Sequence, residues 1–268
     1  MIYIILFFVI HWYGSLFFQT VFLHRYAAHG SIKMSPFWEK VFYVGTWIFQ
    51  GSNYLSAYGY GVMHRMHHAY ADTEKDPHSP KYSSNLFEMM WTTKSVYGDI
   101  NRKKVKVDKQ FTDGVPDWRA FDNFASSYYS RIAWGTAYVL FYMAFAPSLW
   151  WYLLLPFHFF MAPIHGAIIN WFAHKIGYVT YKVKDTSKNL MFWDIFMMGE
   201  GYHNNHHTHG GDANFAKKWY EIDPSYQILK VLNLFRVIRF TKNTHSKPKP
   251  QKISEPILIN PIPVAQKA

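Results

Sequence analysis

The sequence predicts an all-α integral membrane protein with three or four spans, capped by a mainly helical cytoplasmic domain. Two stretches, residues 1–24 and 132–174, support this prediction because they contain no Asp, Glu, Lys or Arg. About 20 helical residues cross a hydrocarbon core of about 30 Å. The first stretch therefore accommodates one span, and the second accommodates two that are joined by a turn at residues 146–148. We expect spans near residues 2–23, 132–146 and 149–172.

The basic residues predict how these spans are oriented. All 28 Lys and Arg residues lie at or after Arg25 and outside residues 132–174. Because Lys and Arg are enriched in cytoplasmic loops, residues 24–131 and 174–240 are expected in the cytoplasm and the amino terminus on the opposite side. The first stretch has no basic region before it and no A-x-A cleavage site, so we interpret it as a retained anchor and not as a signal peptide.

Residues 41–64 form a third uncharged segment that is long enough to cross a membrane. A crossing would place His24 and His64 about 30 Å apart on opposite faces. The segment also contains polar residues such as Gln50 and Ser52, which suit lipid poorly. We therefore expect it to be interfacial, or re-entrant and folded against the cytoplasmic domain.

The carboxyl-terminal part of the sequence predicts one more helix and a tail. Asp223 is the expected N-cap and Pro224 the first helical residue, with an apolar helix running from Tyr226 to about Phe240. Residues 241–268 are rich in Lys and Pro, which predicts a disordered tail.

The composition excludes several classes of function. The chain contains no cysteine, so it cannot form a disulfide, supply a thiolate ligand or hold an iron-sulfur cluster. The net charge of +11 does not indicate nucleic acid, since the basic residues follow the cytoplasmic edges of the apolar stretches. Anionic lipid headgroups, a CoA-like substrate or an acidic redox partner fit this distribution better.

Nine histidines stand in three clusters with one outlier. They are His24 and His29, then His64, His67 and His68, then His203, His206 and His207, and finally His174. Residues three and four apart share one face of a helix, so each H-x-x-H-H triplet can point in one direction. His24 and His29 would be rotated by about 140° on a continuous α-helix, so we expect the helix to end or unwind between them, with Gly30 just beyond.

Neutral imidazole is a common ligand for iron, copper, nickel and zinc, so these histidines predict a metal site in the cytoplasmic domain. A structural zinc site needs four ligands, whereas nine histidines are enough for two metals with open positions. The Glu and Glu-x-x-His arrangement of carboxylate di-iron bundles is missing. Two irons held mainly by nitrogen could use O₂ to remove hydrogen from a methylene group. A zinc-dependent membrane hydrolase and a histidine-rich metal transporter remain as alternatives of a different class.

The histidine boxes and the residues around them resemble the membrane fatty acid desaturases, and specifically the acyl-CoA branch that acts at the Δ9 position of stearoyl-CoA-like substrates. The resemblance is carried by the order H-x4-H, H-x2-H-H, H-x2-H-H around an uncharged hairpin. It extends to the segments around them, which are residues 64–78, Asn170-Trp-Phe-Ala-His174 and Gly199-Glu-Gly-Tyr-His-Asn-Asn-His-His207. The family usually has a helical hairpin before the first box, whereas only 23 residues precede His24 here.

The resemblance implies a ligand set and a reaction. The nine histidines would bind two iron ions, with Asn170 reaching one of them through water. The implied reaction uses O₂ to form a cis double bond in a long-chain acyl group, carried by CoA or else by acyl carrier protein or a phospholipid. A di-iron lipid hydroxylase and a sphingolipid or glycerolipid desaturase are alternatives with the same oxidant. Electrons would come from a ferredoxin, a rubredoxin or a cytochrome b5-type protein, since no redox domain is visible in the sequence.

Six further residues are candidates for supporting roles. Glu200 and Asp76 are expected to accept hydrogen bonds from ligating imidazoles, or else to act in a cap or turn. Arg25 and Arg65 lie inside the boxes and are candidates for binding the substrate head group, with ion pairs to cytoplasmic carboxylates as the alternative. Trp12 and Leu16 precede His24 by about three and two helical turns, and we expect them to form the floor of an acyl tunnel.

Overall fold

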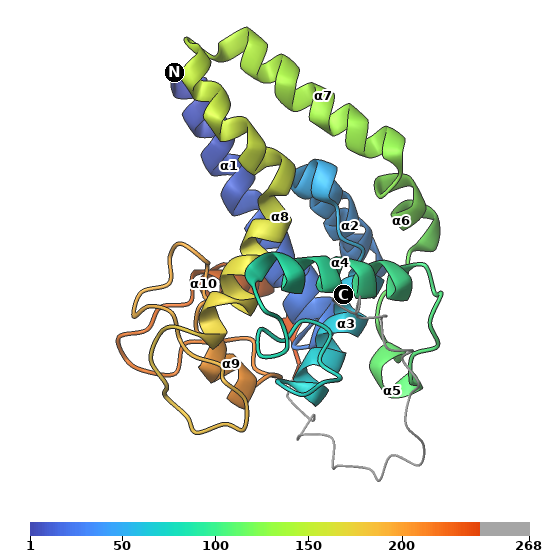
Figure 1. Cartoon of the computed structure of the whole chain (residues 1–268), viewed down its shortest axis with the longest axis vertical. Helices are drawn as coiled ribbons and strands as arrows, with labels where there is room; N and C mark the ends of the chain where they lie inside the picture. The colour runs from blue at the N-terminus through green and yellow to red at the C-terminus, as the bar shows by residue number, and fades with distance from the viewer. Residues whose placement is uncertain (242–268) are drawn as a thin grey trace, which may run out of the picture.

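The computed structural model describes residues 1–241 and divides them into an elongated helical end and a broader end. The long helices α1 (Ile2–Phe18), α7 (Tyr128–Phe145) and α8 (Leu155–Asn170) extend together at one end (Figure 1). The shorter helices and the loops surround the other end of α1 and α8. The remaining helices are α2 (Pro36–Gln50), α3 (Ala57–Tyr70), α4 (Leu86–Asn101), α5 (Lys109–Thr112), α6 (Arg119–Ala125), α9 (His203–Thr208) and α10 (Pro224–Leu234).

Two helical segments of the described chain are long and apolar enough to cross a membrane, Ile2–Ala28 and Leu149–His174. They contain the predicted spans 2–23 and 149–172. Helix α7 covers the predicted span 132–146 but is not among them, because its first turns add two tyrosines and Arg131 to the apolar residues. The number of spans therefore stays a prediction.

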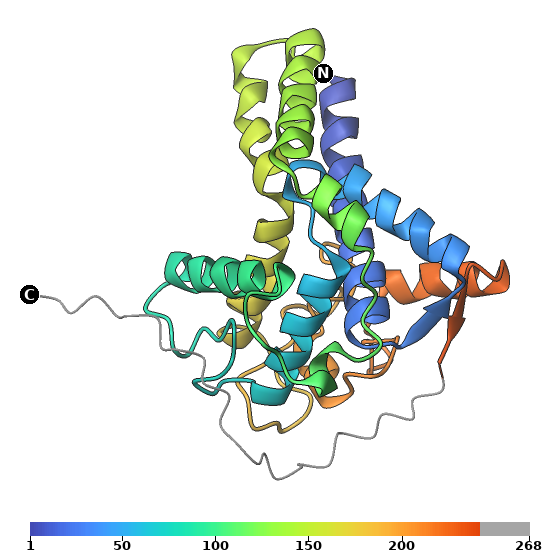
Figure 2. The same cartoon turned by 90° about the vertical axis from the view of Figure 1, so that its right-hand side faces the viewer.

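The uncharged residues 41–64 return to the end of the molecule from which they start. Helix α2 packs along α1, the chain turns at Gly51–Asn53 against α7 and α8, and α3 leads back to the histidines (Figure 2). The ring centroids of His24 and His64 lie only 4.4 Å apart. The segment is thus folded back, as expected of a re-entrant segment, and it does not separate the two boxes.

Two glycines let α1 and α2 approach closely. A Cβ atom on Gly14 of α1 would lie 2.1 Å from the ring of Phe49 on α2. A Cβ atom on Gly45 of α2 would likewise lie 2.2 Å from the ring of Phe18 on α1. Each helix therefore receives an aromatic ring of the other where a side chain is absent, and the rings of Phe18 and Phe49 stack with centroids 5.3 Å apart.

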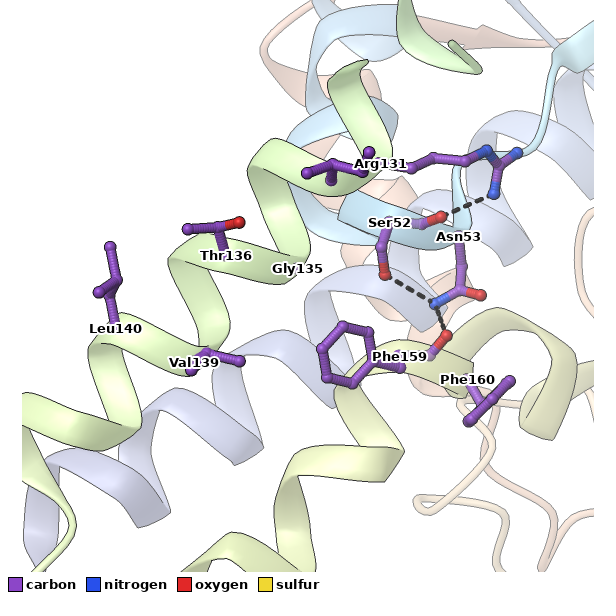
Figure 3. Close-up of a pocket in the computed structure, with 10 residues that line it drawn as sticks. Ser52, Asn53, Arg131, Gly135, Thr136, Val139, Leu140, Phe159 and Phe160 are labelled. Carbon is purple, nitrogen blue, oxygen red and sulfur yellow. Dashed lines mark hydrogen bonds between the residues drawn. The ribbon is translucent and has the colours of Figure 1, made fainter. Parts of the chain in front are cut away.

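The tip of the folded-back segment caps a kink in α8. Pro163 has no amide hydrogen, so the carbonyl of Phe159 four residues earlier loses its helical partner. Phe160 leaves the helical conformation, with φ −126° and ψ 18°. The Asn53 side-chain amide donates to the freed Phe159 carbonyl and to that of His158 at 3.3 Å (Figure 3). This contact explains why Asn53, a polar residue, lies among apolar helices. A pocket of about 690 Å³ lies beside it, between the tip of the segment, α7 and α8.

Histidines in the long helices also connect them. His11 Nδ1 on α1 lies 2.6 Å from His158 Nδ1 on α8, and His158 Nε2 lies 2.9 Å from the Tyr142 hydroxyl on α7. Polar groups in apolar surroundings are stable only when they find partners, so these contacts fix how the three helices pack.

The carboxyl-terminal helix ends earlier than the sequence predicted. Asp223 caps α10 by accepting from the Tyr226 amide at 3.0 Å, as expected. The helix stops at Leu234, however, and Arg236 adopts a positive φ of 60°. Residues Ile238–Phe240 then form strand β2, which pairs antiparallel with β1 (Ile32–Met34) just after the first histidine box. The expectation of helix to Phe240 was wrong because strand pairing competes successfully for these residues.

The fold is mostly helical, as predicted, with this two-stranded ribbon as an addition. Thr241, the first residue of the expected tail, continues the ribbon by donating to the carbonyls of Ser31 and Gly30 at 3.1 and 2.8 Å. The rest of the expected tail, residues 242–268, lies outside the described residues.

Replacing Asn53 by Leu should destabilise the protein, because the Phe159 carbonyl would lose its donor in apolar surroundings. We expect a loss of about 1–3 kcal/mol in the free energy of unfolding, measured by denaturation in detergent. In a Pro163→Ala background, the amide of residue 163 can donate to the Phe159 carbonyl. Asn53→Leu should then lower the free energy of unfolding by less than it does in the unaltered protein. Equal losses in the two backgrounds would contradict the capping role.

Candidate metal centre

The first histidine box lies on a π-helix, Gln19–Ala28, that continues α1. Its hydrogen bonds run from residue i+5 to residue i, as from the His29 amide to the His24 carbonyl at 3.0 Å. This wider winding reduces the rotation of about 140° that an α-helix would impose on two residues five apart. The His24 and His29 rings therefore face the same space, with centroids 4.9 Å apart. The predicted unwinding between the two histidines is confirmed, and its form is a π-helix.

The two arginines of the boxes hold the π-helix in place. Arg25 is fully buried, forms ion pairs with Glu200 at 3.0 Å and Asp223 at 2.8 Å, and stacks on Phe215 at 3.8 Å. Arg65 donates to the last carbonyls of the π-helix, those of Ala27 at 3.2 Å and Ala28 at 2.6 Å, which have no partner within the helix. Arg25 thus makes the ion pairs that were the alternative to head-group binding, and Arg65 binds backbone carbonyls. The head-group role of both arginines stays a prediction.

The nine histidines come together as two groups beyond the carboxyl-terminal end of α1. The five-histidine group contains His24, His29, His64, His68 and His206, and the four-histidine group contains His67, His174, His203 and His207. Within each group, one nitrogen from every ring lies within 4.8 Å of all the others. Each group is therefore compact enough for its imidazoles to share one metal ion.

Each H-x-x-H-H triplet contributes to both groups. On α3, the pair four residues apart, His64 and His68, joins the five-histidine group, while His67 turns to the other. On α9 the division is reversed, because His203 and His207 join the four-histidine group and His206 joins the first. The two short helices thus bridge the groups, which places both metal positions in one continuous site.

The distances between ring nitrogens fit metal coordination. Nε2 atoms face one another at 3.0 Å between His24 and His206 and at 2.9 Å between His29 and His64. In the other group the Nε2 atoms of His174 and His203 lie 3.0 Å apart. Two nitrogens at right angles on one metal ion, each about 2.1 Å from it, are separated by about 3.0 Å.

A second observation also fits a bound cation. The Nδ1 atoms of His67 and His207 contact carboxylates, Asp76 at 2.9 Å and Asp185 at 3.1 Å, so each Nδ1 carries the hydrogen. In neutral imidazoles both Nε2 atoms then carry lone pairs, yet they face each other at 3.2 Å. Facing lone pairs repel, and a metal ion bound by both would remove this repulsion. The arrangement of the imidazole nitrogens therefore fits a bound metal ion.

Four acidic residues contact the far sides of the rings. The predicted partners Glu200 and Asp76 contact His24 and His67, with Glu200 2.7 Å from His24 Nδ1. Asp185 and Asp72 were not predicted; Asp72 lies 3.6 Å from His174 Nδ1 and is also bound by Thr186. Asp72 belongs to the same turn-rich segment as Asp76, which was a usable signal, whereas nothing in the local sequence distinguishes Asp185.

Electrostatics lowers the pKa of several rings and of the carboxylates beside them. Burial, and then neighbouring positive groups, lower the pKa of five ligand candidates, which are His29, His64, His68, His203 and His206. Burial alone would raise the pKa of Asp76, but the charge and hydrogen bond of His67 outweigh it and lower the pKa to about 2. Neutral imidazole is the form that binds metal, so the site needs little proton release to load.

A comparison with known proteins identifies the family. The family model described as fatty acid desaturase matches residues 1–232. The chain belongs to the fatty acid desaturase family. Members of this family are oxidoreductases that act on fatty acyl groups and generally use a di-iron centre with O₂, and the two histidine groups can hold metal.

Three curated relatives illustrate the likeness. The chain is 28% identical over 231 residues to the sn-1 stearoyl-lipid 9-desaturase of Synechocystis sp., covering 83% of this chain and 66% of the relative. It is 29% identical over 224 residues to Delta-9 acyl-lipid desaturase 2 of Arabidopsis thaliana, covering 80% and 67%. It is 30% identical over 224 residues to the icosanoyl-CoA 5-desaturase of Limnanthes douglasii, covering 80% and 57%. The chain spans about two thirds of the length of the first of these relatives.

The residues expected to form the acyl tunnel of this desaturase-family chain lie in one apolar cluster. Trp12 and Leu16 are buried together with Met161 and Ile169 of α8 and with Met197 and Met198, which precede the third box. Asn170 is the last residue of α8, four positions before His174, and its side chain makes no hydrogen bond within the described residues. The cluster therefore connects the long helices to the histidines, and the amide of Asn170 is available to a ligand.

Replacing Asp185 by Asn should weaken metal binding in the four-histidine group. The loss of its carboxylate removes the charge that fixes the His207 ring, and such changes typically reduce metal affinity about 10-fold to 100-fold. After equilibration with a chelator, metal analysis should find about one metal per chain in this variant, against about two in the unaltered protein.

Asp99→Asn provides the matched control, because Asp99 pairs with Arg102 on the exposed side of α4. It should retain both metals. Equal metal content in the two variants would contradict the orienting role of Asp185.

Proposed function

We propose that this protein uses O₂ to introduce a cis double bond, at the Δ9 position, into a long-chain fatty acyl group. The convergence of nine imidazoles, six of them buried, into two linked groups carries this proposal, together with membership of the desaturase family. Two iron ions bound there would supply, with external electrons, the oxidising power to remove two hydrogens from adjacent carbons.

The residues of the chain have three roles in this proposal. The nine histidines hold the metals through Nε2, and the carboxylates of Glu200, Asp76 and Asp185 lie against Nδ1 of their rings, whereas Asp72 reaches His174 through the Thr186 hydroxyl. The apolar cluster around Trp12 and Leu16 excludes water and holds the acyl chain. Because methylene groups are chemically alike, positioning of the chain decides which bond reacts. The positions of Trp12 and Leu16 thus set the distance from the acyl terminus to the oxidised carbons.

The carrier of the acyl group has two candidates. Acyl-CoA is supported by the resemblance of the histidine boxes to the acyl-CoA branch of the family. Two similar proteins are also named as desaturases of acyl-CoA substrates. An acyl group esterified to a membrane lipid is supported by the names of other relatives, such as the acyl-lipid desaturases of Arabidopsis thaliana. Arg25 and Arg65 stay candidates for the head group of either substrate, although both also make internal contacts.

The site is proposed to face the cytoplasm at a membrane, with electrons delivered by a ferredoxin, a rubredoxin or a cytochrome b5-type protein. The distribution of Lys and Arg supports this side, since the uncharged long helices end at the histidines.

Expression in a host that lacks its own desaturase should produce monounsaturated fatty acids, detected by gas chromatography. His206→Ala removes a buried member of the five-histidine group and should abolish the product while leaving membrane accumulation unchanged. His209→Ala is the matched control, because His209 belongs to neither group, and it should retain activity.

The nature of the product separates the alternatives. Labelled acyl chains that gain a hydroxyl group would instead identify a lipid hydroxylase. Tightly bound zinc with activity independent of iron would support a hydrolase. Supplying the acyl group as CoA thioester or as phospholipid to purified membranes, with a reductant and donor, distinguishes the two carriers.

Replacing Trp12 by Ala should shift the preference towards longer acyl chains. The smaller side chain opens space in the cluster between α1, α8 and Met197. Fatty acids of several chain lengths would be supplied and the products compared by gas chromatography, with Phe37→Ala, at an exposed position on α2, as control. An unchanged product profile would show that Trp12 does not form the end of the tunnel.

A further inference from the structure

An exposed apolar surface lies beside the centre on the loop between α8 and α9. In residues 191–196, Met-Phe-Trp-Asp-Ile-Phe, every apolar side chain is at least 36% exposed, and Trp193 reaches 68%. Trp219, 95% exposed, joins this surface, and its ring borders a pocket of about 720 Å³ with Phe192, Trp193 and Tyr220. We call residues 191–196 together with Trp219 the aromatic surface.

The only charged residue of the segment is withdrawn from this surface. Asp194 is fully buried, and its carboxylate accepts from the backbone amides of Met197 at 3.1 Å, Gly199 at 3.0 Å and Gly201 at 2.6 Å. A loop exposed to water would ordinarily turn its charge outward and its apolar side chains inward. This loop does the reverse, so its outer face suits an apolar environment.

The position of the loop indicates which environment this is. Phe196 packs against Trp12 of α1 with ring centroids 4.9 Å apart, and its carbonyl accepts from the Trp12 indole at 3.4 Å. Trp12 lies in the middle of the predicted span 2–23 and about 18 Å along the helix from His24. The loop therefore extends from the centre to the middle of this predicted span.

Basic residues border the aromatic surface. Lys175 stacks on Trp171 with its ammonium group 3.5 Å from the ring, and the Lys188 ammonium donates to the Lys175 carbonyl at 2.7 Å. Lys218 immediately precedes Trp219, while Lys217 before it pairs with Asp212 at 2.5 Å. Aromatic side chains with Lys beside them are typical of the zone where lipid headgroups meet acyl chains.

We propose that the aromatic surface inserts into the cytoplasmic leaflet and forms a membrane contact separate from the spanning helices. This inference rests on the membrane location that is part of the proposed function. A lipid surface is favoured over a protein partner because the aromatic surface contacts a predicted span through Trp12 and has withdrawn its only charge. The contact would also hold Met197 and Met198, which directly follow the loop, at a constant depth beside the acyl chain.

The absence of cysteine allows a direct test. Trp193→Cys would be labelled with an environment-sensitive fluorophore in the full chain, reconstituted in vesicles of equal parts phosphatidylcholine and phosphatidylglycerol. We expect blue-shifted emission that nitroxide-bearing lipids quench at least about two-fold. Lys182→Cys is the control, since Lys182 is exposed on the same loop next to Tyr181, which packs on His209 beyond the centre. Its label should remain quenched by aqueous iodide and not by lipid.

A Trp193 label that behaves like the Lys182 label would overturn the proposal. Self-quenching that rises with protein density, without quenching by lipid, would also overturn it and indicate contact between two copies. Fatty acid products are measured on the same preparations. If products form while the label is exposed to water, only the membrane contact of the aromatic surface is contradicted. If the label is inserted but no products form, only the proposed reaction is contradicted. Retained metal content shows that each labelled protein is folded.

Discussion

The packing of nine imidazoles into one space is the constraint on which the rest of the structure depends. Neutral rings whose Nε2 lone pairs face one another at about 3 Å repel, and a cation bound between them removes the repulsion. Carboxylates lie on the opposite side of the rings: Asp76 and Asp185 accept from Nδ1 of His67 and His207, Glu200 lies beside Nδ1 of His24, and Asp72 acts through Thr186. The fold therefore places the ring nitrogens where they can bind metal ions that accept nitrogen ligands.

The unusual features of the backbone follow from this constraint. A π-helix is needed because two histidines five residues apart cannot face one site from an α-helix. Its irregular end is stabilised by Arg65, which binds carbonyls that the helix leaves free, and by buried Arg25. The folded-back segment exists because α3 must return to the same end as His24, and its polar tip is stabilised in turn by the kink at Pro163. The ribbon of β1 and β2 closes the chain behind the first box.

These dependencies explain which predictions from the sequence succeeded. The folded-back course of residues 41–64 could be predicted because a crossing would have separated His24 from His64, and the unwinding before His29 followed from helix geometry. For single polar residues the sequence left alternatives open. Arg25 and Arg65 were candidates for a head group or for ion pairs with carboxylates, and the structure gives them Asp223, nearly 200 positions away, and backbone carbonyls as partners. The end of α10 was missed, since its competitor, strand β1, lies about 200 residues earlier.

The sequence by itself determined the ligand candidates, their spacing, the uncharged helices and the family, because these are local patterns of residue type. Only the tertiary structure decided how each triplet divides between the two groups. Helical spacing permits all three histidines of a triplet to point one way, but ring directions depend on the facing helix, and α3 and α9 face each other with reversed divisions. The carboxylate partners Asp72 and Asp185 were decided in the same way, because a hydrogen bond depends on distance in space and leaves no trace in the order of residues.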